Sequence, residues 1–287
     1  MKIAVIDIGS NSVRLTTWQD GKTLYKDLNT TRLGEGTAKT RALTNNAIER
    51  TAQAVKTFKQ RAVSEGAEKT YAFATEAVRS AVNGADFCAR VKEVCGVEVE
   101  VLSGETGAAL GCAGALQGRD GVVVDVGGSS SEVIFSVGGK TEFSYSLPTG
   151  SVRLFDEAGR SFEKLGKVID EKISKVSYPE AKDLPVVAIG GMATTVASVY
   201  LGLKVYDPEK VHGTKISSEW IGSMAGRICS MPVDEVKAIE GMEPRRADVI
   251  GGGALLLYKL VKTLGADSVI ISESDNLEGY VALKTTT

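Results

Sequence analysis

Hydrophobic and polar positions follow two different periods along this chain. Short runs of β-branched residues, such as the IAVI at 3–6, are typical of buried strands. Longer segments carry apolar residues at helical spacing, as Val55, Phe58 and Ala62 do within 43–63. The pattern therefore predicts a mixed α/β protein. Strands are expected at 70–75, 97–102, 143–147, 185–189 and 268–272, and helices at 43–63, 76–81, 87–94, 105–116, 161–176, 193–200, 217–229 and 247–264.

Two stretches of the chain repeat one pattern. Residues 3–15 (IAVIDIGSNSVRL) and 121–134 (GVVVDVGGSSSEVI) each contain a strand, an Asp, a turn rich in Gly and Ser, and an alternating segment that returns as a second strand. The offset is constant, since 125 minus 7 is 118. The aligned positions are Val5 with Val123, Asp7 with Asp125, Gly9 with Gly127, and Ser12 with Ser130. Two such hairpins at domain-sized spacing predict a duplicated fold in which the two turns face each other.

The spacing of the repeat also suggests where one domain ends. The chain has 287 residues and a mass of 30.2 kDa, which suits two domains of ordinary size. A turn at 118–121 leads from a helix of small residues into the second hairpin. We therefore expect an N-terminal domain at 1–117 and a C-terminal domain at 118–287, whose last helix is a candidate to pack back on the first domain.

Charge and composition exclude several classes of protein. Lys plus Arg number 34 against 36 Asp plus Glu, so the chain lacks the basic excess of a dedicated nucleic-acid binder. A single histidine, His212, argues against a His-dependent triad or a His-rich metal centre. The four scattered cysteines form no CxxC pair, as expected in a reducing compartment. No apolar run reaches the roughly 18 residues that span a bilayer, and the first residues form a strand instead of a signal peptide. We expect a cytoplasmic protein with neither nucleic acid nor membrane as a partner.

The two glycine turns have the chemistry of phosphate sites. Backbone N–H groups and hydroxyls that converge on one point suit phosphate oxygens, and glycine permits close approach because it has no Cβ. The carboxylates of Asp7 and Asp125, just before the turns, are candidates to hold Mg²⁺ between them. The alternative is that both turns are only tight hairpins capped by these Asp residues. The candidate phosphate ligands are Gly9, Ser10, Asn11 and Ser12 in the first turn and Gly127, Gly128, Ser129 and Ser130 in the second.

Nine short motifs occur in an order that resembles one known family. They are DIGSNSVRL (7–15), RLGEG (32–36), FATEAVRSA (73–81), VLSGE (101–105), VDVGGSSSE (124–132), PTGSVRL (148–154), IGGMATT (189–195), VHG (211–213) and EPRRADVIGGGALLL (243–257). Together they are similar to the short, two-domain form of the exopolyphosphatase/guanosine pentaphosphate phosphohydrolase family, within the actin, Hsp70 and sugar-kinase superfamily. The resemblance covers nearly the whole chain.

The resemblance implies a fold and an activity. The fold is two ribonuclease H-like α/β domains that flank a cleft. The activity is removal of the terminal phosphate of inorganic polyphosphate or guanosine pentaphosphate by metal-assisted attack of water. Polyphosphate and guanosine penta- or tetraphosphate are the implied partners, Mg²⁺ or another divalent cation is the implied cofactor, and a homodimer stays an open expectation.

The resemblance also assigns roles to individual residues. It implies that the two turns grip phosphate oxygens and that Arg79 contacts the phosphate chain. Asp125 and Glu132 match acidic positions tied to metal binding and activity. The Gly190–Gly191 pair resembles the place where the superfamily contacts a nucleotide.

The chain departs from the family pattern at one position that matters for catalysis. The family usually reads Ser-Gly-x-Glu-Glu-Ala-Arg, and its last Glu is regarded as the base that activates water. Here Gly107 takes that position, which leaves Glu105 as the best remaining base if 103–107 is loop and not helix. An alternative follows: a weak or inactive polyphosphate or alarmone sensor that has kept the turns and lost the base. A kinase or ATPase of the superfamily is a third reading.

Overall fold

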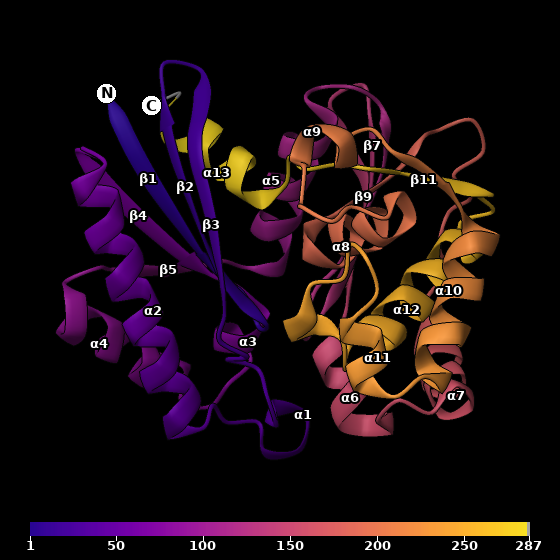
Figure 1. Ribbon diagram of the computed structural model, residues 1–287. Helices are drawn as coiled ribbons and strands as arrows, with labels where there is room; N and C mark the ends of the chain where they lie inside the picture. The colour runs from indigo at the N-terminus through magenta and orange to yellow at the C-terminus, as the bar shows by residue number, and fades with distance from the viewer. Residues whose placement is uncertain (286–287) are drawn as a thin grey trace.

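Two sheets of matching strand order, the second with one extra edge strand, organise the molecule, which is described here from a computed structural model of residues 1–285 (Figure 1). The first sheet has the order β3-β2-β1-β4-β5, with β1 antiparallel to β2 and parallel to β4. The second has the order β10-β11-β9-β6-β7-β8, with β6 antiparallel to β7 and parallel to β9. These are two ribonuclease H-like domains, so the predicted fold class is confirmed. The strands are β1 (Lys2–Ile8), β2 (Ser12–Gln19), β3 (Lys22–Thr30), β4 (Lys69–Ala74), β5 (Val99–Val101), β6 (Gly121–Val126), β7 (Ser131–Val137), β8 (Lys140–Leu147), β9 (Val186–Ile189), β10 (Lys215–Ser217) and β11 (Ser268–Ile271).

Helices cover both sheets, and most begin and end where the sequence indicated. In the longest, the Thr44 side chain accepts a hydrogen bond from the backbone N–H of Ala47, and the apolar face with Val55 and Phe58 is buried against the first sheet. The helices are α1 (Thr37–Thr40), α2 (Asn45–Ser64), α3 (Glu76–Arg79), α4 (Gly84–Cys95), α5 (Gly104–Leu116), α6 (Ser151–Ala158), α7 (Phe162–Ile173), α8 (Gly190–Leu201), α9 (Pro208–Val211), α10 (Ser218–Ser230), α11 (Val233–Lys237), the 3₁₀ turn η1 (Pro244–Arg246), α12 (Ile250–Thr263) and α13 (Asn276–Thr285). Within residues 1–285, none of them combines the length and apolarity that crossing a membrane requires.

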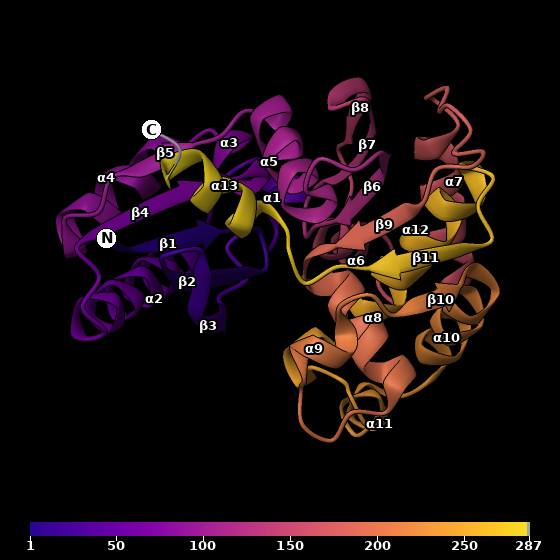
Figure 2. The ribbon, with the colours of Figure 1, turned by 90° about the horizontal axis from the view of Figure 1, so that it is seen from above.

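Helices α5 and α13 connect the two domains, because each of them packs on the sheet of the other domain. Helix α5 follows the first sheet in sequence, yet its buried side, with Ala108 and Cys112, packs on β6, β7 and β9 of the second. Helix α13 follows the second sheet, yet it packs on the first, where the Tyr280 ring lies 4.7 Å from that of Phe73. Figure 2 shows α13, in yellow, lying over the strands of the first domain.

Glycines allow the two exchanged helices to cross at very short range. A Cβ added to Gly114 of α5 would lie 2.1 Å from the carbonyl oxygen of Asp275, just before α13. A Cβ on Gly279 of α13 would lie 2.0 Å from the carbonyl oxygen of Leu110. Because these contacts are with backbone, no side-chain rotation can relieve them. The crossing therefore requires glycine on both helices.

We predict that Gly114→Ala lowers the free energy of unfolding by roughly 3 kcal/mol, because the new methyl group forces the two backbones apart. The measurement is urea or thermal unfolding followed by circular dichroism. The matched control is Gly107→Ala on the same helix, where an added Cβ meets no atom within 4 Å. That change should be neutral or stabilise by up to about 1 kcal/mol, since alanine is the better helix former. Equal stability of the two variants would contradict the close crossing.

Candidate active site

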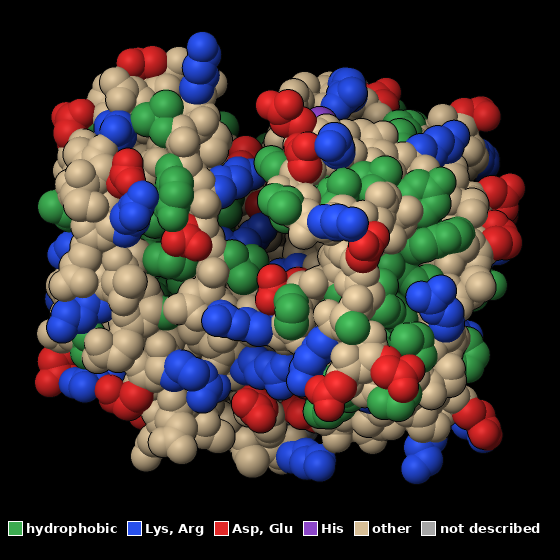
Figure 3. Space-filling model, viewed as in Figure 1, with side chains coloured by type: hydrophobic (Ala, Val, Ile, Leu, Met, Phe, Trp, Pro, Cys, Tyr) green, Lys and Arg blue, Asp and Glu red, His purple; other side chains and the backbone are tan. Residues whose placement is uncertain are grey.

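A cavity of about 130 Å³ lies where the two hairpin turns, α3 and the first turns of α5 and α8 meet. It lies between the two domains. Figure 3 shows that the surface of the molecule is hollowed between the domains, with Lys and Arg side chains along the edge. Of the residues predicted to bind phosphate, it is lined by Gly9, Ser10, Asn11, Ser12, Arg79, Gly127, Gly128 and Ser130. The structure therefore brings together side chains that stand more than 100 positions apart in the sequence.

The two turns have the same backbone geometry. The N–H of Gly9 donates to the carbonyl of Ser12 at 3.0 Å, and the N–H of Gly127 donates to the carbonyl of Ser130 at 3.0 Å. The turns also touch, because a Cβ on Gly128 would lie 2.8 Å from the Cβ of Ser10. Ser129, the remaining predicted phosphate ligand, does not line the cavity. Its hydroxyl is buried without a partner and packs toward the loop before α1.

The residue opposite the Asp differs between the two hairpins, and this difference sets the charge of the site. In the first hairpin Arg14 stands opposite Asp7, and its Nε donates to Asp7 Oδ2 at 2.9 Å. Arg14 also donates to Asp275, just before α13. The position equivalent to Arg14 is 14 plus 118, which is Glu132, and it stands opposite Asp125. The first hairpin is thus neutralised internally, whereas the second places two carboxylates together.

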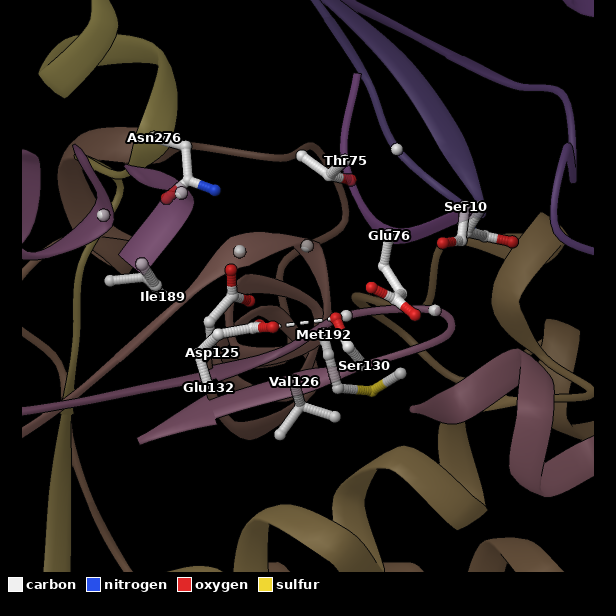
Figure 4. Close-up of a pocket in the computed structure, with 18 of the residues that line it drawn as sticks. Ser10, Thr75, Glu76, Asp125, Val126, Ser130, Glu132, Ile189, Met192 and Asn276 are labelled. Carbon is white, nitrogen blue, oxygen red and sulfur yellow. Dashed lines mark hydrogen bonds between the residues drawn. The ribbon is translucent and has the colours of Figure 1, made fainter. Parts of the chain in front are cut away.

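The carboxylates of Asp125 and Glu132 form a half-buried like-charge pair. Burial, with the neighbouring Glu132 as second cause, raises the pKa of Asp125 well above its ordinary value. Burial also raises the pKa of Glu132, although the Ser146 and Ser130 hydroxyls, which donate to its Oε1 at 2.7 and 2.8 Å, oppose the shift. Neither oxygen of Asp125 accepts a hydrogen bond from any residue within 1–285. The geometry leaves this carboxylate facing the cavity, as Figure 4 shows.

The carboxylates that line this cavity suit a Mg²⁺ ion that is also bound to phosphate better than a Mg²⁺ ion held by the protein alone. Across residues 1–285, no group of three or more carboxylate, imidazole or thiolate side chains is arranged to hold a metal ion unaided. Mg²⁺ is commonly bound through one or two carboxylates, several waters and substrate phosphates. Asp125 and Glu132 suit that arrangement. Asp7 suits it less, because its Oδ2 is taken by Arg14 and only the buried, unpartnered Oδ1 is left.

Arg79 and Glu76 form an ion pair on the opposite wall of the cavity. Both side chains line it, and Glu76 is joined to Arg79 Nη2 across one turn of α3. The Nη1 of Arg79 donates to the carbonyl of Leu102 at 2.7 Å, which fixes the guanidinium near the start of α5. Helix α3 has only four residues, so the charge that faces the cavity here comes from the guanidinium and not from a helix terminus.

Helix α5 begins at Gly104, and this corrects the prediction for Glu105. The Ser103 side chain caps the helix by accepting from the N–H of Thr106 at 3.0 Å, so 103–107 is not a loop. Glu105 is exposed and does not line the cavity. Gly107 does line it, and a Cβ there would meet no atom within 4 Å. The position to which the family resemblance assigns a base is open space in this protein.

Gly190 and Gly191 stand between this cavity and a second one of about 790 Å³. Gly190 has φ +81°, and a Cβ there would lie 2.6 Å from Asp125 Oδ1, so glycine is needed for Asp125 to keep its place. Against Gly191 lies Arg246, whose Nη1 donates to Thr195 Oγ1 at 2.6 Å. Burial lowers the pKa of Arg246 to about 10, which leaves it charged at neutral pH.

Three residues with charged side chains in the cavity were missed by sequence reasoning as site residues: Arg14, Glu76 and Arg246. Two of them could have been found from the sequence. Arg14 occupies the position in the first repeat that Glu132 occupies in the second, and Glu76 lies three residues before Arg79, the spacing at which helical side chains pair. Arg246 is one of several basic residues in its motif, and only the packing distinguishes it from the exposed Arg245.

Comparisons with known proteins agree with this architecture. The model of the Ppx/GppA phosphatase family matches residues 13–284. Exopolyphosphatase 2 of Mycobacterium tuberculosis is 29% identical over 315 residues, which cover 97% of each chain. The bifunctional 3-dehydroquinate synthase/phosphatase of Fusobacterium nucleatum is 29% identical over 306 residues, and the match spans 97% of this chain but only 46% of that longer relative. The crystal structure of the Aquifex aeolicus member of the Ppx/GppA family is 33% identical, with a TM-score of 0.78 over 100% of this chain and 98% of that one.

From the pair of Asp125 and Glu132 we predict how the stability of the protein depends on pH. Since the folded state raises both carboxyl pKa values, the protonated pair contributes stability at low pH, and this contribution is lost as pH rises through the raised values. In the presence of a chelator, Asp125→Asn should therefore raise the melting temperature more at pH 8 than at pH 5. A few degrees are expected, since about 1 kcal/mol shifts the melting temperature of a chain of this size by roughly 2–4 °C. A variant that gains no more stability at pH 8 than at pH 5 would show that the pair is not repulsive.

Proposed function

The chain belongs to the Ppx/GppA phosphatase family, and from that membership we propose that it hydrolyses the terminal phosphoanhydride of a phosphate chain. Inorganic polyphosphate is the first candidate substrate. One observation carries the proposal: two matched glycine turns meet at a cavity where Asp125 and Glu132 stand together, and within residues 1–285 neither carboxylate forms a salt bridge. A phosphate chain with its divalent cation supplies both an anion for the turns and a positive charge for the carboxylates.

The mechanism that we propose asks the protein mainly for positioning. The N–H groups and hydroxyls of the two turns hold the terminal phosphate oxygens, and the Arg79 guanidinium neutralises charge from the opposite wall. Asp125 and Glu132 are the residues that would hold Mg²⁺, which supplies Lewis-acid polarisation of phosphoryl oxygens when bound.

Guanosine pentaphosphate is the second candidate substrate. The cavity of about 790 Å³ beyond Gly190 and Gly191 is within the size range of small-molecule sites, and it adjoins the phosphate cavity. A guanosine seated there would place its phosphates toward the turns. Assays of polyphosphate and guanosine pentaphosphate side by side distinguish the two substrates.

The open space at Gly107 favours one other function, that of a sensor which binds the phosphate chain without cleaving it. If the protein binds polyphosphate tightly and releases no phosphate, Gly107→Glu should create turnover. Gly107→Gln, which fills the same space without a base, should not. That result would identify a competent scaffold that lacks only its carboxylate.

For the hydrolase, we expect Mg²⁺-dependent release of orthophosphate from long-chain polyphosphate, and Asp125→Asn should reduce the rate at least about 100-fold, as for loss of a metal-linked group. The measurement is colorimetric phosphate release beside a binding titration on the same protein. Asp120→Asn is the control on the same hairpin, because Asp120 is exposed and only caps the turn at Gly138. Absence of both binding and release would refute the proposed function.

A further inference from the structure

Four carboxylates line the phosphate cavity: Asp7, Glu76, Asp125 and Glu132. Three of them already have other partners or another proposed role. Arg14 holds Asp7, and Asp125 and Glu132 form the like-charge pair that suits a cation. Glu76 is the one that stands apart from the two hairpins, since it belongs to α3.

Glu76 faces the like-charge pair from across the cavity. In Figure 4 its side chain comes from the side of Thr75, and its carboxylate lies between Ser10 of one turn and Ser130 of the other. Its charge acts on Glu132, whose pKa it helps to raise, after burial as the main cause. A phosphoryl group gripped by both turns would therefore lie between Glu76 on one side and Asp125 with Glu132 on the other.

Glu76 also lies beside the open space in α5. Its carboxylate is bound by Arg79 Nη2, and the same Nη2 would lie 3.8 Å from a Cβ on Gly104. Gly107 is one helical turn further along α5, with nothing within 4 Å of its Cβ position. The side chain of Glu76 is only 16% exposed, so the carboxylate is directed into the protein and not into bulk solvent.

We propose that Glu76 is the catalytic base of this protein: it accepts the hydrogen bond of the attacking water and takes its proton. This inference rests on the proposed hydrolase function. The water oxygen bonds to the terminal phosphorus while the bridging P–O bond breaks, and that electron pair leaves with the shortened chain. The proton moves to Glu76 and then to solvent, and orthophosphate is released. The ion pair with Arg79 holds the Glu76 carboxylate in place at the wall of the cavity.

The first test is Glu76→Gln, assayed for phosphate release from polyphosphate with Mg²⁺. Glutamine keeps an oxygen that can accept from Arg79, but it cannot take a proton from water. We expect kcat to fall about 10²–10⁴-fold, the usual contribution of a general base, with KM nearly unchanged. The control is Glu93→Gln, because Glu93 forms an ion pair with Arg90 at the same three-residue spacing and does not line the cavity.

Two comparisons separate a base from a residue that only positions Arg79. If Glu76→Gln stays active while Glu76→Ala is inactive, the carboxylate serves only to hold the guanidinium, and the proposal is overturned. In the double variant Glu76→Gln/Gly107→Glu, a carboxylate returns from the other wall, and we expect much of the lost kcat to be recovered. Glu76→Gln/Gly107→Gln should stay at the level of Glu76→Gln alone.

Failure of this inference differs from failure of the proposed function. Wild-type protein that releases no phosphate refutes the hydrolase and with it the base. Wild-type activity that persists in a folded Glu76→Gln variant refutes only the role of Glu76. The melting temperature of each variant, measured beside its activity, excludes unfolding as the cause of a loss.

Discussion

The crossing of α5 and α13 is the constraint on which the rest of the structure depends. Each helix covers the sheet of the other domain, and the backbones meet at Gly114 and Gly279 with no room for a methyl group. The N-terminal turns of both helices line the cavity between the two hairpin turns, through Gly107 on α5 and Asn276 on α13. Arg14 adds a link from the first hairpin to Asp275 at the start of α13. Any change in the angle between the domains is therefore transmitted to the walls of the site.

Duplication supplies the shape of the site, and divergence of one residue pair supplies its charge. The two turns share the same hydrogen bond and both carry an Asp at the strand end. Because Arg14 neutralises Asp7, the first hairpin offers hydrogen-bond donors without excess negative charge. Glu132 at the equivalent position doubles the charge beside Asp125. If both turns hold a phosphate as proposed, it meets donors from each half, whereas the carboxylate pair that suits a cation comes from one half only.

The sequence alone predicts the segments that repeat and the segments whose apolar residues have a clear period. The duplicated hairpins, most buried strands and the long amphipathic helices follow from local pattern. Strand β3 was missed because most of its side chains are exposed and it lies at the sheet edge, so no apolar face marks it. The place of α13 on the first sheet and the inward direction of Glu76 depend on contacts between distant segments, which no local pattern encodes. Glu105 was misjudged because its orientation depends on whether the helix begins at Gly104 or later.

The chemistry of phosphoryl transfer explains why the position of a base can differ within one scaffold. The transition state is loose, with charge spread over the equatorial oxygens, so most of the catalysis comes from positioning and charge neutralisation. A carboxylate that orients one water needs only to lie on the attack side of the phosphorus, at hydrogen-bonding distance. Helices α5 and α3 both line the cavity, and Arg79 lies beside both of them. If Arg79 contacts the phosphate chain as proposed, the same guanidinium holds a carboxylate from α3 near the position on α5 to which the family resemblance assigns one.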